Sequence, residues 1–260
     1  MSNLSTAFFI SDAHFGINLT GCEDREMHFF TFLDTFRNQM SSLYIIGDLF
    51  DFWIEYKRAI RPDYFNVLYH LKKAIDNGVE IHYLAGNHDF ALGSFLSDQL
   101  GVHIHEDHYQ TVIQNRKVHL YHGDGLLKQD RGYRILKRLL RNKTNQFFYK
   151  MLHPNIGVKL GTGASGSSRK YQERYTPEFR EQVKREYREN GIRYLQNGTE
   201  IVMFGHSHNA ELVTYDNGIY CNTGAWLIHY NYATMCNGEL KLWTYPPTAG
   251  SPIEIPAVRG

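Results

Sequence analysis

The sequence IHYLAGNHD, residues 81–89, places a short apolar run directly before a cluster of polar side chains. An apolar run of this length, followed by a glycine, is typical of a strand buried within a sheet. The same arrangement occurs in AFFISDAH (7–14), LYIIGDLFD (43–51), VHLYHGD (118–124) and IVMFGHSH (201–208). Five buried strands are therefore predicted, and each ends in residues that can carry chemistry.

Helical segments separate the first three of these strands. Residues 24–39 carry apolar side chains near the helical period. Pro62 can open a second helix that runs to Ile75, and Gly78 is its expected stop. Strands that alternate with helices lie parallel in one sheet, with the helices packed on its faces. The sequence therefore predicts an α/β fold.

The segment 125–199 differs from the chain on either side of it. It reads as helices and loops with almost no strand pattern, and residues 175–197 are helix-like and highly charged. The stretch Gly161–Ser168 is rich in glycine and serine, which is typical of a mobile loop. We therefore expect a core made of residues 1–124 and 200–260, with 125–199 inserted as a helical cap.

Short strands resume after residue 199, and hairpin turn signals such as Asn237-Gly238 separate some of them. Besides 201–204, the predicted strands are 212–215, 218–221, 232–235 and 240–245. The proline-rich residues after Pro246 are predicted to be irregular.

The composition is that of a folded domain. The chain has 260 residues, of which 42% are hydrophobic and 21% charged, with a formal net charge of +1. So small a charge gives no general attraction to nucleic acid or membranes, and only a local patch could provide one. The three cysteines form no Cys-x-x-Cys pair, which favours a reducing compartment. No stretch resembles a signal peptide or approaches the roughly 18 apolar residues of a membrane span, so a cytoplasmic location is expected.

The polar residues after the five strands should meet at one edge of the sheet, because open α/β sheets bind ligands outside the carboxyl ends of their strands. Carboxylate and imidazole groups together favour manganese, iron or zinc over metals that prefer thiolates. One carboxylate can bridge two ions, and two ions about 3.5–4 Å apart can activate water and hold phosphoryl oxygens. The pattern predicts two divalent metal ions, with Mn²⁺ preferred and Fe or Zn as alternatives.

The motifs Asp-x-His, Gly-Asp-x-x-Asp, Gly-Asn-His-Asp, His-Gly-Asp and Gly-His-x-His, in this order, resemble those of the calcineurin-like metallophosphoesterases. Each motif alone is weak, and an isolated His-Gly-Asp is more often an ordinary turn. Five motifs in the family's order, each after a predicted strand, are specific. The resemblance implies a four-layer αββα sandwich and a metal-dependent phosphoester hydrolase.

The resemblance also implies a role for each matching residue. One ion would be held by Asp12, His14, Asp48 and His208. The other would be held by Asp48, Asn87, His122 and His206, so that Asp48 bridges the pair. His88 would contact the phosphate and protonate the leaving oxygen, which suits an imidazole that titrates near neutral pH, and Asp51 would orient His88.

Within this family, the sequence resembles the UDP-2,3-diacylglucosamine hydrolases of lipid A biosynthesis. The stretch GDLFDFW (47–53) matches their second motif, and Asp130 and Tyr133 follow His-Gly-Asp at a similar spacing. The resemblance implies hydrolysis of a UDP-linked glycolipid to a lipid monophosphate and UMP. It also implies substrate contacts from Asn87, His88, Asp130, Tyr133, Ser168 and Arg169. One position departs from the pattern, since those enzymes carry arginine where this chain has His88.

The first part of the insertion is strongly basic. Between Gly125 and Lys150, eight lysines and arginines accompany a single acid, Asp130, and apolar residues interleave with them. A basic amphipathic helix can lie on a membrane surface with anionic lipids. A helix that packs on a core and exposes a basic face gives the same pattern. The patch would also attract a nucleic-acid backbone, although the dispersed aromatics of a base-stacking groove are lacking.

The preferred prediction is a cytoplasmic hydrolase of UDP-2,3-diacylglucosamine that contacts the inner face of the inner membrane through the basic cap. A nuclease or small-molecule phosphodiesterase of the same fold is the alternative, and salt-dependent binding of single-stranded nucleic acid would favour it. A non-enzymatic scaffold is less expected, because every predicted metal-ligand position is filled. No obligate protein partner is evident.

Overall fold

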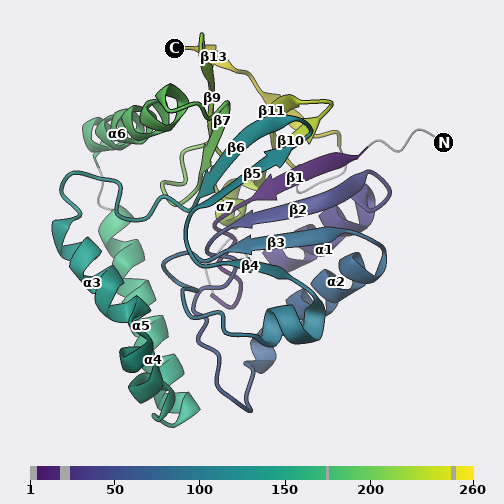
Figure 1. The fold of residues 1–260 in the computed structure, drawn as a ribbon. Helices are drawn as coiled ribbons and strands as arrows, with labels where there is room; N and C mark the ends of the chain where they lie inside the picture. Colours follow the sequence, from purple (N-terminus) through teal and green to yellow (C-terminus); the bar gives the residue numbers. More distant parts are fainter. Residues whose placement is uncertain (1–4, 18–23, 174–175, 247–249) are drawn as a thin grey trace.

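Two β-sheets packed face to face form the centre of the computed structural model, and helices cover their outer faces (Figure 1). The structure describes residues 5–17, 24–173, 176–246 and 250–260. This arrangement is the predicted α/β sandwich.

The first sheet has seven strands in the order β12-β11-β10-β1-β2-β3-β4. Strands β1 to β4 run parallel, whereas β10, β11 and β12 continue the sheet in antiparallel fashion. The strands are β1 (Thr6–Ile10), β2 (Met40–Ile46), β3 (Glu80–Leu84), β4 (His103–His105), β10 (Asn231–Cys236), β11 (Glu239–Thr244) and β12 (Ile253–Ile255).

The second sheet has six strands in the order β13-β8-β9-β7-β6-β5. Its centre, β6, β7 and β9, is parallel, so β6 and β7 both end at the same edge of the sheet. The strands are β5 (Tyr109–Ile113), β6 (Arg116–Tyr121), β7 (Ile201–Phe204), β8 (Glu211–Tyr215), β9 (Gly218–Asn222) and β13 (Val258–Arg259).

Seven α-helices are found in the described part of the chain. They are α1 (Arg25–Phe36), α2 (Phe65–Asp76), α3 (Arg131–Arg141), α4 (Lys143–Lys150), α5 (Pro154–Glu173), α6 (Pro177–Gln196) and α7 (Trp226–His229). A short 3-10 turn at Pro62–Tyr64 leads into α2, and a π-helical turn spans Leu96–Leu100. None of the described helices is long and apolar enough to cross a lipid bilayer.

Alternation along the strands builds the four layers. In β1, Phe8 and Ile10 face the apolar cluster formed with α1 and α2, whereas Ala7 and Phe9 face the cluster between the two sheets. This is the period of two that a strand buried on both faces requires. The amino-terminal helices and the first sheet therefore form two of the layers.

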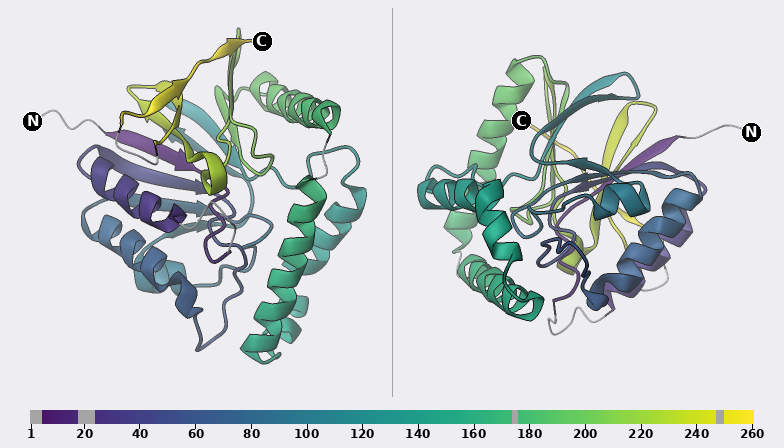
Figure 2. Two further views of the ribbon diagram at one scale, coloured as in Figure 1. Left: turned by 180° about the vertical axis from the view of Figure 1, so that it is seen from behind. Right: turned by 60° about the horizontal axis from the view of Figure 1, so that its bottom comes forward.

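The second sheet repeats this pattern and carries the fourth layer. Met203 of β7 packs between the sheets, whereas Val202 and Phe204 face outward onto Val183 and Tyr187 of α6. Although α6 falls in the range predicted as a cap, it covers the outer face of this sheet. Helices α3, α4 and α5 instead form a group beside the sandwich (Figure 2).

The predicted strands and the helices 24–39, 62–75 and 175–197 are confirmed to within a few residues. The predicted loop at Gly161–Ser168 is wrong, because this stretch lies inside α5. Its first glycine serves close packing, since a side-chain carbon on Gly161 would collide with the ring of Phe52. The irregular tail after Pro246 is also wrong, because β12 pairs with β11 and β13 pairs with β8.

Two leucines test whether α6 belongs to the folded core. Leu195 of α6 is 3% exposed, whereas Leu139 of α3 is 54% exposed. Leu195→Ala is expected to lower the free energy of unfolding by about 2–5 kcal/mol, because it opens a cavity against the sheet. Leu139→Ala should change it by less than about 0.5 kcal/mol. Urea denaturation of both variants measures this, and equal losses would contradict the assignment of α6 to the core.

Candidate metal centre

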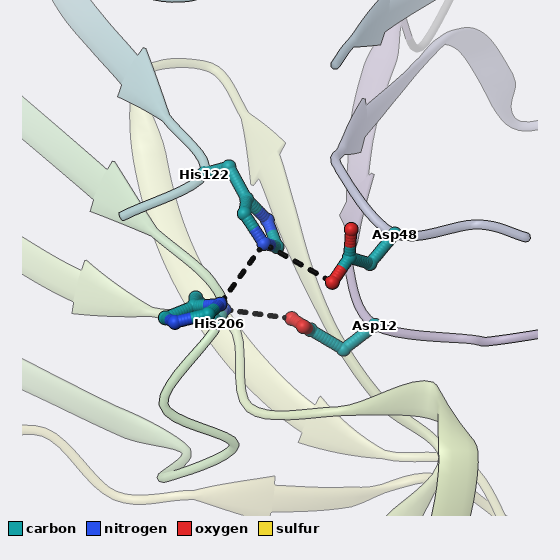
Figure 3. Close-up of side chains that lie close together, drawn as sticks. All are labelled: Asp12, Asp48, His122 and His206. Carbon is teal, nitrogen blue, oxygen red and sulfur yellow. Dashed lines mark hydrogen bonds and ion pairs between the residues drawn. The ribbon is translucent and has the colours of Figure 1, made fainter. Parts of the chain in front are cut away.

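The carboxyl ends of five strands deliver polar side chains to one place between the two sheets. Asp12 and His14 follow β1, Asp48 follows β2 and Asn87 follows β3 in the first sheet. From the second sheet, His122 follows β6, and His206 and His208 follow β7. Figure 3 shows how Asp12, Asp48, His122 and His206 turn toward one another.

The first group of candidate ligands is centred on His122. Its Nε2 lies 3.3 Å from Oδ2 of Asp48 and 3.2 Å from Nδ1 of His206. Oδ1 of Asn87 lies 3.0 Å from the same Nε2. The backbone amide of His206 donates to Oδ2 of Asp12 at 2.8 Å, which links the two sheets.

The second group consists of Asp12, His14 and His208. His208 Nε2 lies 3.2 Å from Oδ1 of Asp12. His14 Nε2 lies 3.9 Å from a carboxylate oxygen of each aspartate, Asp12 and Asp48. Asp48 thus lies beside both groups, and its role as a bridge between two ions stays a prediction.

The backbone is strained at these residues. In the described part of the chain, five non-glycine residues with positive φ belong to the candidate centre: Asp12 (53°), His14 (48°), Asp48 (53°), His206 (62°) and His208 (56°). A positive φ costs a side chain with a Cβ of the order of 1 kcal/mol or more. Strain concentrated on one set of side chains is typical of a functional site that the surrounding fold holds in place.

Neighbouring glycines leave room for the carboxylates. A Cβ on Gly86 would collide with Oδ1 of Asp48 and lie 2.6 Å from its amide nitrogen. A Cβ on Gly205 would lie 2.8 Å from Oδ2 of Asp12. These two positions therefore require glycine because the candidate ligands pack directly against the backbone.

The electrostatics favour ionised carboxylates at Asp12 and Asp48 and neutral rings at His14 and His206. Burial opposes ionisation of Asp12, but the His208 imidazole more than offsets it and lowers the pKa of Asp12 to about 2. The pKa of Asp48 also falls well below its usual value, since His122 and His88 outweigh its burial. Burial lowers the pKa of His206 to about 4 and that of His14 well below its usual value. Metal ligation requires these protonation states.

The two carboxylates have their largest effect on the pKa of His122. Burial opposes a charge on its ring, yet Asp48 raises the pKa of His122 to about 10. Its Nδ1 lies 2.8 Å from the carbonyl oxygen of Ile46, which can only accept, so Nδ1 donates there and Nε2 faces the centre. A divalent cation would satisfy the same negative potential with Nε2 as a ligand.

Unsatisfied buried polar atoms also fit a metal centre at this place. Within the described residues, both ring nitrogens of His14 are buried without a hydrogen-bond partner. Buried polar atoms of this kind are rare and costly unless another group satisfies them. Carboxylate, imidazole and amide donors at these distances form the donor set of a dinuclear divalent-metal site.

His88 lies at the edge of the centre. Its Nε2 is 3.9 Å from Oδ2 of Asp48, and its ring centroid is 4.7 Å from that of His14. His88 Nδ1 lies 2.9 Å from the backbone carbonyl oxygen of Asp51 and 3.9 Å from Oδ1 of that residue. The main-chain carbonyl of Asp51 is thus closer to the His88 ring than the Asp51 carboxylate is, and the orienting role of Asp51 stays a prediction.

Asp89 is a residue whose importance the sequence did not reveal. This fully buried carboxylate accepts from the amide of Gly86 at 2.7 Å and from that of Asp48 at 3.3 Å. It also accepts from the amide of Phe50 and the hydroxyl of Tyr83. Asp89 thus ties together the loops that present Asp48 and Asn87. Its place in the Gly-Asn-His-Asp motif was the available signal.

The other residues predicted to contact substrate lie in different parts of the insertion. The hydroxyl of Tyr133 donates to Oδ2 of Asp124 at 2.7 Å, and Lys137 approaches the same carboxylate at 3.0 Å. Asp130 lies half-buried just before α3. Ser168 and Arg169 fall within α5, but their side chains lie outside the described residues.

An apolar cavity of about 370 Å³ opens beside the centre at Asn87 and His88. Its remaining walls come mostly from Phe52 and from α3, α4 and α5, including Tyr133, Leu136, Leu140, Tyr149 and Leu160. The sequence pattern of α3 allowed two readings for its leucines, contact with a membrane or packing on the core. Their place around a cavity depends on how three separate helices pack, which no local pattern encodes.

Residues 6–210 match the family of calcineurin-like phosphoesterases. Because this match spans most of the chain and all five motifs, the chain belongs to the calcineurin-like phosphoesterase family. It is therefore a metal-dependent hydrolase.

Curated relatives extend this similarity over most of the chain. The UDP-2,3-diacylglucosamine hydrolase of Porphyromonas gingivalis is 28% identical over 255 residues, covering 92% of this chain and 97% of that protein. The enzyme of the same name from Neisseria meningitidis is 27% identical and covers 89% and 93%. That of Haemophilus influenzae is 26% identical and covers 88% and 93%.

Solved structures with a similar chain course are more distant. A novel archaeal phosphodiesterase aligns with a TM-score of 0.47 at 13% identity, over 92% of this chain and 99% of that one. The Zn²⁺ complex of Vps29 from Entamoeba histolytica aligns with a TM-score of 0.44 at 13% identity, over 96% and 97%.

Two substitutions should separate metal binding from the other functions of the centre. Asp48→Ala is expected to abolish hydrolysis of an aryl phosphodiester and to lower bound metal, because this carboxylate faces both ligand groups. His88→Ala should slow turnover by roughly 10²–10⁴-fold while bound metal stays at the wild-type level. Metal analysis of the purified variants tests this, and equal metal loss in both would show that His88 is misassigned.

A glycine pair tests the close packing at Asp48. Gly86→Ala should displace the Asp48 carboxylate and lower both metal content and turnover by at least roughly tenfold. Gly132→Ala in α3 is the matched control, since nothing lies within 4 Å of its new methyl group. Full activity in Gly86→Ala, measured beside this control, would contradict the described packing.

Proposed function

We propose that the protein hydrolyses the pyrophosphate of UDP-2,3-diacylglucosamine to a lipid monophosphate and UMP. The observation that carries this proposal is the apolar cavity that opens at Asn87 and His88, directly beside the candidate metal centre. The names of the curated relatives support the same substrate.

The cavity suits a substrate that is apolar at one end and phosphorylated at the other. Leu136, Leu140 and Leu160 can shield acyl carbons from water, and each buried methylene contributes about 0.8 kcal/mol. Asn87 and His88 provide the polar groups where the cavity meets the centre. Sites with many apolar walls and a few convergent polar groups are typical of small-molecule binding.

Two of the basic residues of α3 are already paired with carboxylates of the core. Lys137 pairs with Asp124 at 3.0 Å, and Arg141 pairs with Asp107 at 3.2 Å. These two cations thus hold α3 to the core, so they contribute little to a groove for phosphates. The lipid substrate is therefore preferred over the nuclease alternative.

The chain's own residues would share the reaction as follows. Metal ions would be held by Asp12, His14, Asp48, Asn87, His122, His206 and His208. When bound, two such ions supply an activated water and polarise the phosphoryl oxygens. We propose Mn²⁺ as the native ion, although this donor set also accepts Fe and Zn.

His88 would act as the general acid. Because the Asp51 carbonyl oxygen can only accept, the proton on Nδ1 is held there, and Nε2 of protonated His88 can give its proton to the leaving oxygen. His88 also lines the apolar cavity, so the leaving oxygen would belong to the acylated half of the substrate.

We further propose that α3, α4 and α5, within the 125–199 insertion, hold the protein on the cytoplasmic face of the inner membrane. Their surface carries large exposed apolar side chains, including Phe147 (61%), Phe148 (62%) and Met151 (70%). Lys143 and Lys150 are the first and last residues of α4, the helix that carries both phenylalanines. Exposed apolar residues beside lysines suit a bilayer with anionic lipids.

Substrate hydrolysis is the direct test. Purified protein with Mn²⁺ should release UMP from UDP-2,3-diacylglucosamine, and Leu140→Gln should raise the KM by roughly tenfold because it places an amide in the apolar cavity. Ile135→Gln is the matched control, since Ile135 is 62% exposed and outside the residues that line the cavity. UMP release is followed by chromatography. No release, with aryl phosphodiester hydrolysis retained, would overturn the substrate.

Membrane contact has its own test. The double substitution Phe147→Ser and Phe148→Ser should reduce co-flotation with vesicles that contain phosphatidylglycerol by several-fold, since it removes two exposed apolar anchors. Val112→Ser is the control, because Val112 is 64% exposed on β5, away from these helices. Equal flotation of all three proteins would contradict docking through this surface.

A further inference from the structure

A second cavity, of about 480 Å³, lies beside the metal centre at His208. Its walls come from different elements than those of the apolar cavity: α6, the segment that follows β7, α7 and the end of β11. Its volume is in the range of small-molecule sites. The proposed function so far leaves it unused.

The walls of this second cavity combine several polar side chains with a few apolar ones, among them Ala210 and Ile228. Lys184, Asn209 and His229 offer a cation, an amide and an imidazole, and Asn231 and Thr244 add further hydrogen-bonding groups. These groups can contact a phosphate, a ribose and the edge of a base. The apolar cavity, by contrast, is lined mainly by leucines and aromatic rings.

Lys184 is available for an anionic ligand. Its ammonium group lies 2.7 Å from Glu181, one turn away on α6, and the Glu181 side chain is 68% exposed. Exposed ion pairs of this kind contribute little to stability, so exchange of Glu181 for a ligand phosphate costs little. A phosphate carries more negative charge than a carboxylate and offers three acceptor oxygens, so it can replace Glu181 as the partner of Lys184.

Backbone hydrogen bonds tie this cavity to the metal-ligand loop. The amide of Trp226 donates to the carbonyl of Ser11 at 3.0 Å, and that of Leu227 donates to the carbonyl of Asp12 at 2.9 Å. The helix α7, which supplies His229, therefore starts on the residues that present the first metal ligand. Tyr230 follows with a φ of 51°, which fixes the turn after α7.

One buried imidazole links the two cavities. The His14 ring centroid lies 4.7 Å from that of His88, which lines the apolar cavity. It lies 5.7 Å from that of His208, which lines the polar cavity. A substrate phosphate at the metal centre would thus have a hydrophobic site and a hydrophilic site within reach of its two substituents.

We infer that the cavity beside His208 binds the nucleotide half of the substrate, with Lys184 and His229 as specificity-determining residues. This inference rests on the proposed function and adds where the nucleotide half is bound and which residues contact it. The acylated half occupies the apolar cavity at His88, and the nucleotide half occupies the polar cavity at His208.

The test uses UMP as the probe on the full-length protein with Mn²⁺. Inhibition of aryl phosphodiester hydrolysis gives a Ki for UMP and a Ki for inorganic phosphate. Inorganic phosphate can bind only where the phosphate of UMP binds, so the ratio of the Ki for UMP to the Ki for phosphate reports the contribution of the nucleoside. Lys184→Ala and His229→Ala should each raise the Ki for UMP roughly tenfold. At least His229→Ala should also raise the ratio of the Ki for UMP to the Ki for inorganic phosphate.

Two control variants test whether a change in the Ki for UMP comes from the cavity beside His208. Arg185 is next to Lys184 in α6, but it is exposed and does not line the cavity. Arg185→Ala therefore removes one positive charge from α6 and should leave the Ki for UMP at the wild-type value. Leu140→Gln alters the apolar cavity and should leave the Ki for UMP unchanged. Turnover of the aryl diester reports whether each metal centre is intact.

The outcomes separate this inference from the proposed function. If UDP-2,3-diacylglucosamine is hydrolysed but Lys184→Ala and His229→Ala leave the Ki for UMP unchanged, the nucleotide site is overturned and the proposed function stands. If both variants weaken UMP but that glycolipid is not hydrolysed, the nucleotide site stands and the acylated half of the substrate is wrong.

Discussion

Two carboxylates, Asp12 and Asp48, are buried together where the edges of two sheets meet, and the rest of the structure accommodates this constraint. Burial alone would keep such groups neutral. Imidazoles from both sheets and donated backbone amides keep them ionised instead. The same requirement explains the positive φ angles of the neighbouring residues and the glycines that carry no Cβ against the carboxylates. The sandwich is thus a rigid frame around a concentrated negative charge.

Much of this centre could be predicted from the sequence, because each strand and the residue at its end are adjacent in the chain. Asp12, Asp48 and His122 each follow a buried apolar run, and the topology rule for open sheets brings such ends together. Asp89 was harder, because a carboxylate that accepts from backbone amides and a hydroxyl has no sequence pattern of its own beyond the motif. Strands β12 and β13 were missed since they are very short and are stabilised by partners far away in sequence.

The insertion combines two structural tasks that its sequence does not separate. Helix α6 completes the sandwich, and α3 is fixed to the core through Asp124 and Asp107. The other apolar residues of α3, α4 and α5 remain exposed or surround the apolar cavity. Amphipathic periodicity reports only that a face is apolar, and whether that face meets a sheet, a cavity or a bilayer is decided by tertiary packing.

The glycines of α5 have a consequence for the range of ligands. Gly157 and Gly161 let this helix touch Tyr56 and Phe52, on the segment that continues from Asp51. The spacing between helix and loop, and so the width of the apolar cavity, is set by two missing methyl groups. If the cavity holds hydrocarbon tails, as proposed above, these two positions help to set the tail length that fits. Replacing either glycine with alanine would then change which tail lengths fit, without altering the reacting groups.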